Sequence, residues 1–203
     1  MVARYVYHAS EVHGLKVIRP AVSTHGEKWV YAAKDLVMAA LFLSGKGGDL
    51  TCAIGREGGI PYVCERFAGA FEHRYGGVSG SIYVLPGESF VEGRTGWEEE
   101  VVSEEEVYPV EEIRVEDAKG FLEELAREGK LRILLYPERV EEIPEDDEDL
   151  VYRGIVWTRQ WGEVILEEFK RYHPHLISRI REGLREGRYL DSPIGGSGVK
   201  GRE

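Results

Sequence analysis

Residues 51–85 read TCAIGREGGIPYVCERFAGAFEHRYGGVSGSIYVL and decide the class of the fold. Aromatic and β-branched residues gather in three short segments of this stretch, and glycines separate the segments. We predict strands at 51–55, 62–67 and 81–85. The stretch lacks the strand–helix alternation of a doubly wound sheet, so it favours an α+β fold.

The same pattern of short elements continues on both sides of this stretch. Further strands are predicted at 3–8, 29–32, 89–92, 99–103 and 107–115. Helices are predicted at 35–43, 117–129 and 160–186, with Asp35 as a capping residue, Gly129 as a stop and a break near Pro174. The acidic residues 141–149, which include Pro144, are predicted to form a surface loop.

The length of 203 residues suits one domain with a packed core. We expect this domain to span residues 1–190, with a core at 5–115 and a helical C-terminal part at 116–190. Residues 191–203 have little apolar content, and we expect a disordered tail there.

The cysteine count bears on location and on metal binding. Cys52 and Cys64 are the two cysteines, and neither lies in a CxxC or Cys/His cluster. They argue against a disulfide scaffold and against structural zinc, although a bridge between the two stays open. Together with the absence of an apolar run long enough to span a membrane, this predicts a cytoplasmic protein without a membrane partner.

The absence of asparagine, with abundant glutamate and arginine, is typical of heat-tolerant organisms.

The formal net charge of −11 opposes attraction to nucleic acid by the overall field. Residues 170–188 are locally basic, and we interpret them as a solvated helix face. The chain has no GxGxxG after a predicted strand and no GxxxxGK[ST], so neither a dinucleotide-binding Rossmann fold nor a phosphate loop is indicated.

Three short motifs follow one another in the first half of the chain. The first is Tyr7-His8-Ala9-Ser10 at the end of a predicted strand, with Gly14-Leu15 shortly after it. The second is Val30-Tyr31-Ala32-Ala33, and Phe42 follows Tyr31 after eleven positions. The third is Glu98-Glu99-Glu100, which leads into Val101-Val102-Ser103.

In these motifs, over residues 5–115, the chain resembles the ADP-ribosyltransferase fold, in particular its His-Tyr-Glu branch of poly-ADP-ribose polymerases and diphtheria-like toxins. The match is His8-Ala9-Ser10, Tyr31-Ala32-Ala33 with Phe42, and a glutamate at the start of a late strand. Ala9 stands where the family usually has glycine. The resemblance implies split antiparallel sheets with peripheral helices, and NAD as the substrate from which ADP-ribose is transferred to an acceptor, a protein or a nucleic acid.

The resemblance also implies roles for single residues. Glu100 would stabilise the oxocarbenium-like transition state formed when the nicotinamide–ribose bond breaks. His8 would hold a ribose hydroxyl, while the Ala9 backbone and Ser10 would bind the nicotinamide amide. Tyr31 and Phe42 would stack on the nicotinamide ring. Two further candidates complete this set: Glu98, which shares a strand face with Glu100 if 98–103 is extended, and His25, in the loop before Tyr31.

Two other functions fit the same residues. The NAD-dependent RNA 2′-phosphotransferases share this fold, but the acidic balance disfavours an RNA substrate. A non-catalytic module that keeps the fold, and binds a partner through its helical C-terminal third, is the alternative outside the enzymes.

Overall fold

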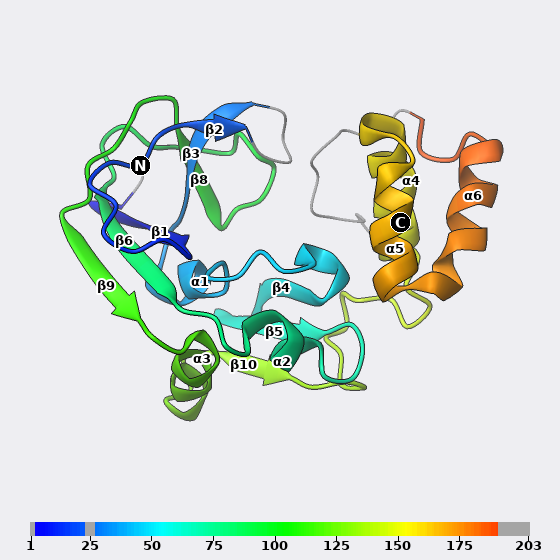
Figure 1. Ribbon diagram of the computed structural model, residues 1–203, viewed down its shortest axis with the longest axis horizontal. Coiled ribbons are helices and arrows are strands. Elements are labelled where there is room, and N and C mark those ends of the chain that lie inside the picture. The colour runs from blue at the N-terminus through cyan, green and yellow to red at the C-terminus, as the bar shows by residue number, and fades with distance from the viewer. Residues whose placement is uncertain (1–2, 23–26, 191–203) are drawn as a thin grey trace.

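A computed structural model of the chain describes residues 3–22 and 27–190. The predicted tail at 191–203 and the candidate His25 lie outside these described residues. The structure confirms a mixed α+β architecture with antiparallel sheets and a helical C-terminal region (Figure 1). Within the described residues, no helix has both the length and the apolar character needed to cross a membrane.

The larger sheet contains seven strands and carries the three sequence motifs. Its path runs β7-β8-β3-β1-β6-β9, and β2 pairs with β3 beside this path. The strands of this sheet are β1 (Tyr5–Ser10), β2 (Ala21–Val22), β3 (Lys28–Ala33), β6 (Gly80–Pro86), β7 (Val91–Glu92), β8 (Glu100–Ser103) and β9 (Glu111–Val115). All of its registered pairs are antiparallel.

The smaller sheet has the order β10-β5-β4. Its strands are β4 (Cys52–Glu57), β5 (Ile60–Glu65) and β10 (Arg132–Leu134). Strands β4 and β5 form an antiparallel hairpin, whereas β10 joins β5 in parallel. The parallel pair departs from the all-antiparallel sheets that we expected, because α3 (Ala118–Arg127) carries the chain back before β10 begins.

An apolar core lies between the two sheets and three short helices. Helices α1 (Leu36–Ala40), α2 (Ala70–Tyr75) and α3 contribute to this core, as do residues from both sheets. A second apolar cluster covers the other face of the larger sheet, where Val6, Val30 and Tyr83 are buried. The alternation of side chains along β1 and β3 explains why both faces are apolar.

The C-terminal helices form a separate cluster, which we call the helical lobe; it stands to one side of the sheets in Figure 1. Its elements are α4 (Glu148–Trp161), α5 (Val164–Tyr172), the 3-10 turn η2 (Pro174–Leu176) and α6 (Ile177–Arg185). Their apolar residues pack together and around Leu50, which ends the 3-10 turn η1 (Gly48–Leu50). Leu50 therefore belongs to the core of the lobe although it lies far from it in sequence.

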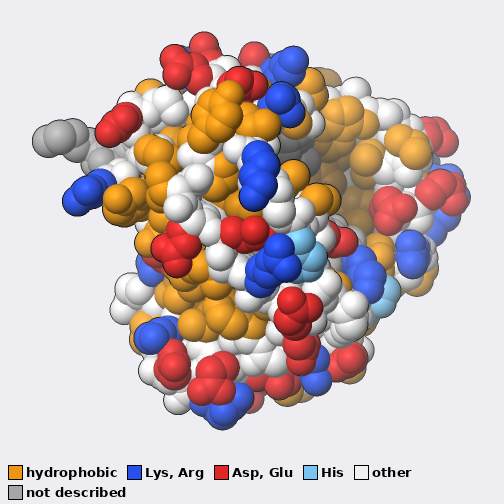
Figure 2. Space-filling model, turned by 60° about the vertical axis from the view of Figure 1, so that its left-hand side comes forward, with side chains coloured by type: hydrophobic (Ala, Val, Ile, Leu, Met, Phe, Trp, Pro, Cys, Tyr) orange, Lys and Arg blue, Asp and Glu red, His pale blue; other side chains and the backbone are white. Residues whose placement is uncertain are grey.

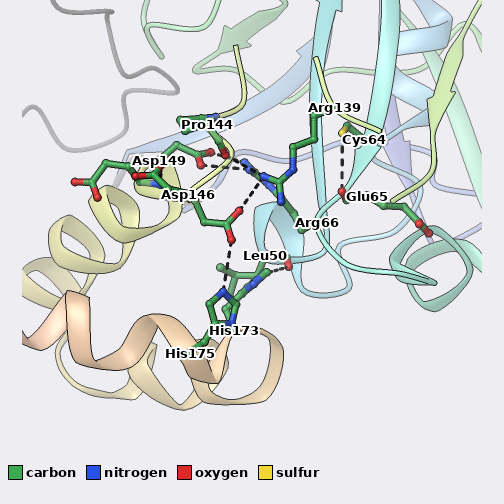
Figure 3. A network of polar contacts seen from close by, with 12 residues as sticks. Leu50, Cys64, Glu65, Arg66, Arg139, Pro144, Asp146, Asp149, His173 and His175 are labelled. Atoms are coloured by element: carbon green, nitrogen blue, oxygen red, sulfur yellow. Dashed lines mark hydrogen bonds and ion pairs between the residues drawn. The ribbon is translucent and has the colours of Figure 1, made fainter. Parts of the chain in front are cut away.

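Polar contacts join the helical lobe to the small sheet (Figure 3). The guanidinium of Arg66, just after β5, donates to both carboxylate oxygens of Asp149 on α4, at 3.3 and 2.5 Å. His73 and His173 contribute further contacts, and the His173 ring bonds to the carbonyl oxygen of Leu50 at 2.6 Å. Arg66 and Asp149 are both largely buried. Their opposite charges therefore compensate each other in a region from which water is excluded.

Several predicted boundaries change in the structure. The helix expected from residue 160 starts at Glu148, so the end of the predicted acidic loop is the first turn of α4. Acidic residues are favourable in the first turn of a helix, so α4 begins with the same residue types as the loop before it. Composition alone therefore does not separate the loop from the helix. Residues 70–75 form helix α2, which was not predicted. The strand expected at 107–115 is shorter than predicted, because β9 begins at Glu111.

The two cysteines lie on opposite faces of the small sheet. Cys64 is directly opposite Ala53, whereas Cys52 is opposite Glu65. Since directly opposed residues share a face and neighbouring residues alternate, the two thiols point apart. Both are buried and free, so the bridge that the sequence left open is not formed.

Candidate functional site

The three motif-bearing strands are neighbours in the larger sheet, in the order β8-β3-β1. Tyr7 on β1 is registered with Ala33 on β3, and Ala33 is in turn registered with Glu100 on β8. Residues separated by more than 60 positions in sequence therefore lie side by side at one level of the sheet. This arrangement places the three motifs on adjacent strands. Side chains alternate along each strand, so Tyr31 and Glu100 lie on the face of Ala33. The His8 side chain, which is registered with Tyr83, lies on the opposite face.

His8 lies where β1 and β3 stop pairing. The two strands are registered only at Tyr7 and Ala33, whereas β1 is registered with β6 along its whole length. Beyond that point the Nδ1 atom of His8 contacts the carbonyl oxygen of Tyr31 at 2.7 Å. The bond from the imidazole thus stands where a backbone hydrogen bond between β1 and β3 would otherwise form. It links the two strands at the point where they diverge.

The protonation state of His8 follows from this contact. Burial lowers the pKa of His8, and the hydrogen bond to the Tyr31 carbonyl acts in the opposite direction. A carbonyl oxygen can only accept, so Nδ1 must carry the proton of the neutral ring. Nε2 then has a free lone pair, which makes it a hydrogen-bond acceptor.

Glu100 begins β8 and shares a sheet face with Ala33 and Tyr31. Burial raises the pKa of its carboxyl, while a side-chain hydrogen bond with Thr95 lowers it. Thr95 is itself buried, in the turn that precedes β8. A carboxylate withdrawn from water interacts more strongly with a nearby positive charge than an exposed one does.

The neighbouring glutamates have different surroundings. β8 begins at Glu100, and Glu98 lies in the preceding turn with an exposed side chain. The strand argument that placed Glu98 beside Glu100 therefore fails, because residue 98 is not extended with residues 100–103. Glu99 instead accepts two hydrogen bonds from Arg56 of β4, at 2.6 and 2.7 Å.

Arg56 also pairs with Asp35, the predicted N-cap residue of α1. Asp35 has this capping role, since its Oδ1 accepts from the amide of Met38 at 2.8 Å. The hydrogen bonds that Arg56 donates to Glu99, and also to Asp35, raise the pKa of Arg56 against the effect of burial and keep it charged. Arg56 thus ties the start of α1 to the turn just before Glu100.

Two pairs of aromatic rings lie near these strands. Tyr31 contacts Trp29 edge-on, with ring centroids 6.0 Å apart, and its hydroxyl donates to the carbonyl of Glu27 at 3.3 Å. Phe42 follows α1 rather than lying on its apolar face, and its side chain is 41% exposed. Phe42 packs edge-on against Trp97, with centroids 5.7 Å apart. Each predicted stacking residue is therefore supported by a tryptophan.

The remaining residues of the first motif lie at the end of β1. Ala9 is registered with Ile82 and packs on the core between the sheets. The hydroxyl of Ser10 accepts a hydrogen bond from the amide of Val12 at 3.1 Å, which shapes the turn that follows the strand. His25 lies outside the described residues, so its predicted contact with ligand stays a prediction.

Sequence reasoning missed Thr95, Trp97 and Arg56. Thr95 and Trp97 lie within five residues of Glu100, so an aromatic and a hydroxyl beside the glutamate run were available as a signal. Arg56 gave no such signal, because its link to Glu99 joins residues 43 positions apart.

The surface carries exposed hydrophobic side chains and two shallow pockets. On the face drawn in Figure 2, hydrophobic side chains are exposed beside a hollow, with charges of both signs around them. Two shallow pockets of about 480 and 600 Å³ lie beside residues 87–92 and 136–145, and neither is lined by His8, Tyr31 or Glu100. Among the described residues, no group of three His, Cys, Asp or Glu side chains is placed to hold a metal ion.

Comparisons of the chain with protein-family models, with curated proteins and with solved structures gave no match.

Proposed function

We propose that the chain is an NAD-dependent ADP-ribosyltransferase-like enzyme, which cleaves the nicotinamide–ribose bond and transfers ADP-ribose to an acceptor. The observation that carries this proposal is the adjacency of β8, β3 and β1. The three motifs lie on these adjacent strands, and the His8 ring bonds to the Tyr31 backbone. Motifs that occurred in the sequence by chance would not be expected to lie on adjacent strands.

Glu100 supplies the charge that the reaction needs. Departure of nicotinamide leaves positive charge on the ribose, as in glycoside hydrolysis. A fixed, partly buried carboxylate stabilises that charge more in the transition state than in bound NAD. Thr95 orients the Glu100 carboxylate and opposes the effect of burial on its pKa.

His8 positions the sugar. Its Nδ1 is occupied by the Tyr31 carbonyl, which leaves Nε2 to accept a hydrogen bond from a ribose hydroxyl. This role requires the neutral ring, and burial favours the neutral ring by lowering the pKa of His8. His8 therefore acts by orientation rather than by proton transfer.

The aromatic residues hold the flat leaving group. Tyr31 is fixed by its contacts with Trp29 and with the Glu27 carbonyl, so its ring face is presented with little loss of side-chain freedom on binding. Phe42 offers a second, exposed ring that Trp97 supports. The backbone of Ala9 and the hydroxyl of Ser10 provide the polar contacts for the carboxamide.

Release of nicotinamide from NAD by the purified protein tests this proposal. We expect turnover that falls by at least about 100-fold in Glu100→Gln, which keeps the shape of the side chain but removes its charge. Glu104→Gln, an exposed residue in the loop after β8, serves as the matched control and keeps full turnover. Glu98→Gln reports whether the exposed glutamate assists the acceptor, because it then lowers transfer but not hydrolysis.

Two outcomes would favour the alternative functions. Turnover that requires a 2′-phosphorylated RNA end would identify a phosphotransferase. A folded protein that binds NAD without turnover, or that does not bind it, would favour a non-catalytic module.

A further inference from the structure

The turn that precedes β8 carries both an aromatic ring and the carboxylate of Glu100. The backbone amide of Glu100 donates to the carbonyl oxygen of Trp97 at 3.2 Å, which closes a turn over residues 97–100. The ring of Trp97 packs on the core between the sheets and lies edge-on against Phe42. The start of β8 is therefore tied, within one turn of the chain, to a ring that is anchored in the core.

Thr95 joins the two ends of this turn. Its hydroxyl accepts a hydrogen bond from the backbone amide of Trp97 at 3.4 Å. The same side chain makes the hydrogen bond that lowers the pKa of Glu100, so the hydroxyl donates its proton to the carboxylate. A hydroxyl can donate one hydrogen bond and accept others, so Thr95 serves both partners at once. Thr95 is only 5% exposed, so little water competes for these contacts.

Phe42 is the part of this arrangement that a ligand can reach. Its side chain is 41% exposed, whereas Trp97 is partly buried, and the two ring centroids are 5.7 Å apart. A flat ring that stacks on Phe42 restricts the motion of Phe42 and, through the edge-on contact, that of Trp97. A restrained Trp97 fixes the turn whose amide and carbonyl groups contact Thr95 and Glu100.

We propose that Trp97 is a positioning residue, which couples the ring of Phe42 to the Glu100 carboxylate through the turn that contains Thr95. The coupling rests on the proposed function, since it gives the bound nicotinamide ring a second use. Stacking of the leaving group at Phe42 then holds the carboxylate in place while positive charge develops on the ribose. Binding of one part of NAD thereby contributes to the rate of the chemical step, and not only to affinity.

Steady-state nicotinamide release by variants of the full chain tests the coupling. We expect Trp97→Leu to lower kcat by about 10- to 100-fold with a change in KM of less than about 3-fold. Trp97→Phe keeps an aromatic edge against Phe42 and restores most of the rate. Trp161→Leu, which alters an exposed tryptophan of the helical lobe, is the matched control and keeps the wild-type kcat.

Thr95→Val provides a readout that a merely structural role would not move. The substitution removes the hydroxyl while the side chain keeps a similar shape, so Glu100 loses the hydrogen bond that lowers its pKa. We expect a lower kcat and a shift of the acid limb of the pH–rate profile to higher pH, because Glu100 acts as a carboxylate. If Trp97 acts through Thr95, the fall in kcat of the double variant is smaller than the product of the two single falls.

The possible outcomes separate the coupling from the proposed function. Circular dichroism shows whether each variant is folded. If Trp97→Leu does not fold, Phe42→Leu combined with Thr95→Val decides, because coupling through the turn makes these two effects non-additive as well. Wild-type turnover together with an unchanged kcat in Trp97→Leu, or with effects that multiply in the double variant, overturns the coupling and leaves the proposed function standing. A folded wild-type chain that releases no nicotinamide overturns both.

Discussion

The imidazole of His8 donates a hydrogen bond from Nδ1 to the carbonyl oxygen of Tyr31, across 2.7 Å, at the point where β1 and β3 cease to pair. A side chain here takes over a contact that the backbone of the sheet would otherwise make. The bond joins the first two sequence motifs and sets the tautomer of the ring. One contact between residues 23 positions apart therefore links the two motifs.

The link between Arg56 and Glu99 predicts an indirect effect on turnover. Arg56→Gln removes the two bonds to Glu99 and the pair with Asp35, so the turn that precedes Glu100 loses its anchor. We expect kcat for nicotinamide release to fall by up to about 100-fold, because small displacements of a reacting group have large effects. Arg56→Lys restores part of the rate. Arg132→Gln, which breaks an ion pair with Glu57 on the same small sheet, is the control and keeps the wild-type rate.

The buried Arg66–Asp149 pair predicts a large loss of stability when it is broken from one side. Arg66 and Asp149 have side chains only 2% and 12% exposed. Asp149→Asn leaves the Arg66 charge uncompensated, and we expect the free energy of unfolding to fall by about 3 to 5 kcal/mol in urea titrations. Glu124→Gln, which breaks the exposed pair with Arg127, lowers it by less than about 1 kcal/mol. Equal losses in the two variants would show that the lobe does not depend on this pair.

His173 contributes to the pH dependence of stability. This residue is 1% exposed, and burial lowers its pKa, while the bond to the Leu50 carbonyl opposes that shift. The unfolded chain takes up a proton near pH 6.5, before the folded chain does, so stability falls as the pH drops below about 6.5 and levels off below the folded pKa. Urea titrations at several pH values should show a smaller fall for His173→Gln. The exposed His175→Gln should keep the wild-type slope, and a His173→Gln slope equal to wild type would contradict this assignment.

Two helical glycines predict opposite responses to alanine. A Cβ on Gly154 of α4 would lie 2.5 Å from Cδ1 of Ile180 and 3.1 Å from Cζ of Phe169, both in the core of the lobe. Gly154→Ala is therefore expected to destabilise the protein by about 1 to 3 kcal/mol, despite the higher helix propensity of alanine. On α3, the three atoms nearest to a Cβ on Gly120 all belong to the Asp117 side chain. That side chain can move, so Gly120→Ala is expected to be neutral or stabilising by up to about 1 kcal/mol; thermal unfolding of both variants measures the difference.

Local signals in the sequence predicted those parts of the fold that depend on local chemistry. Asp35 before an apolar run indicated the capped start of α1, and Gly129, with φ of 73°, marks the end of α3 as expected. The mixed α+β class and the helical C-terminal region followed from the spacing of short strands and from residues 160–186. The start of α4 was missed because its first turn is acidic, like the loop before it.

The candidate site was harder to predict from the sequence, because the pairing of strands that are distant in sequence determines it. The start of β8 distinguishes Glu100 from Glu98, and it follows a turn in which Gly96 adopts a φ of 76°. Nothing local to the glutamate run separates its members. The contact of Arg56 with Glu99 and the support of Phe42 by Trp97 likewise arise only when distant segments meet.

Calorimetric titration with NAD tests whether His8 and Tyr31 belong to an NAD-binding site. We expect saturable binding by the wild-type chain, with loss of binding in Tyr31→Ala and His8→Ala. Binding should be unchanged in Tyr108→Ala, an exposed tyrosine outside the three motifs. Circular dichroism of each variant confirms that it is folded. A folded wild-type protein that shows no heat of NAD binding, or that binds NAD equally well after both substitutions, would contradict the assignment of the site.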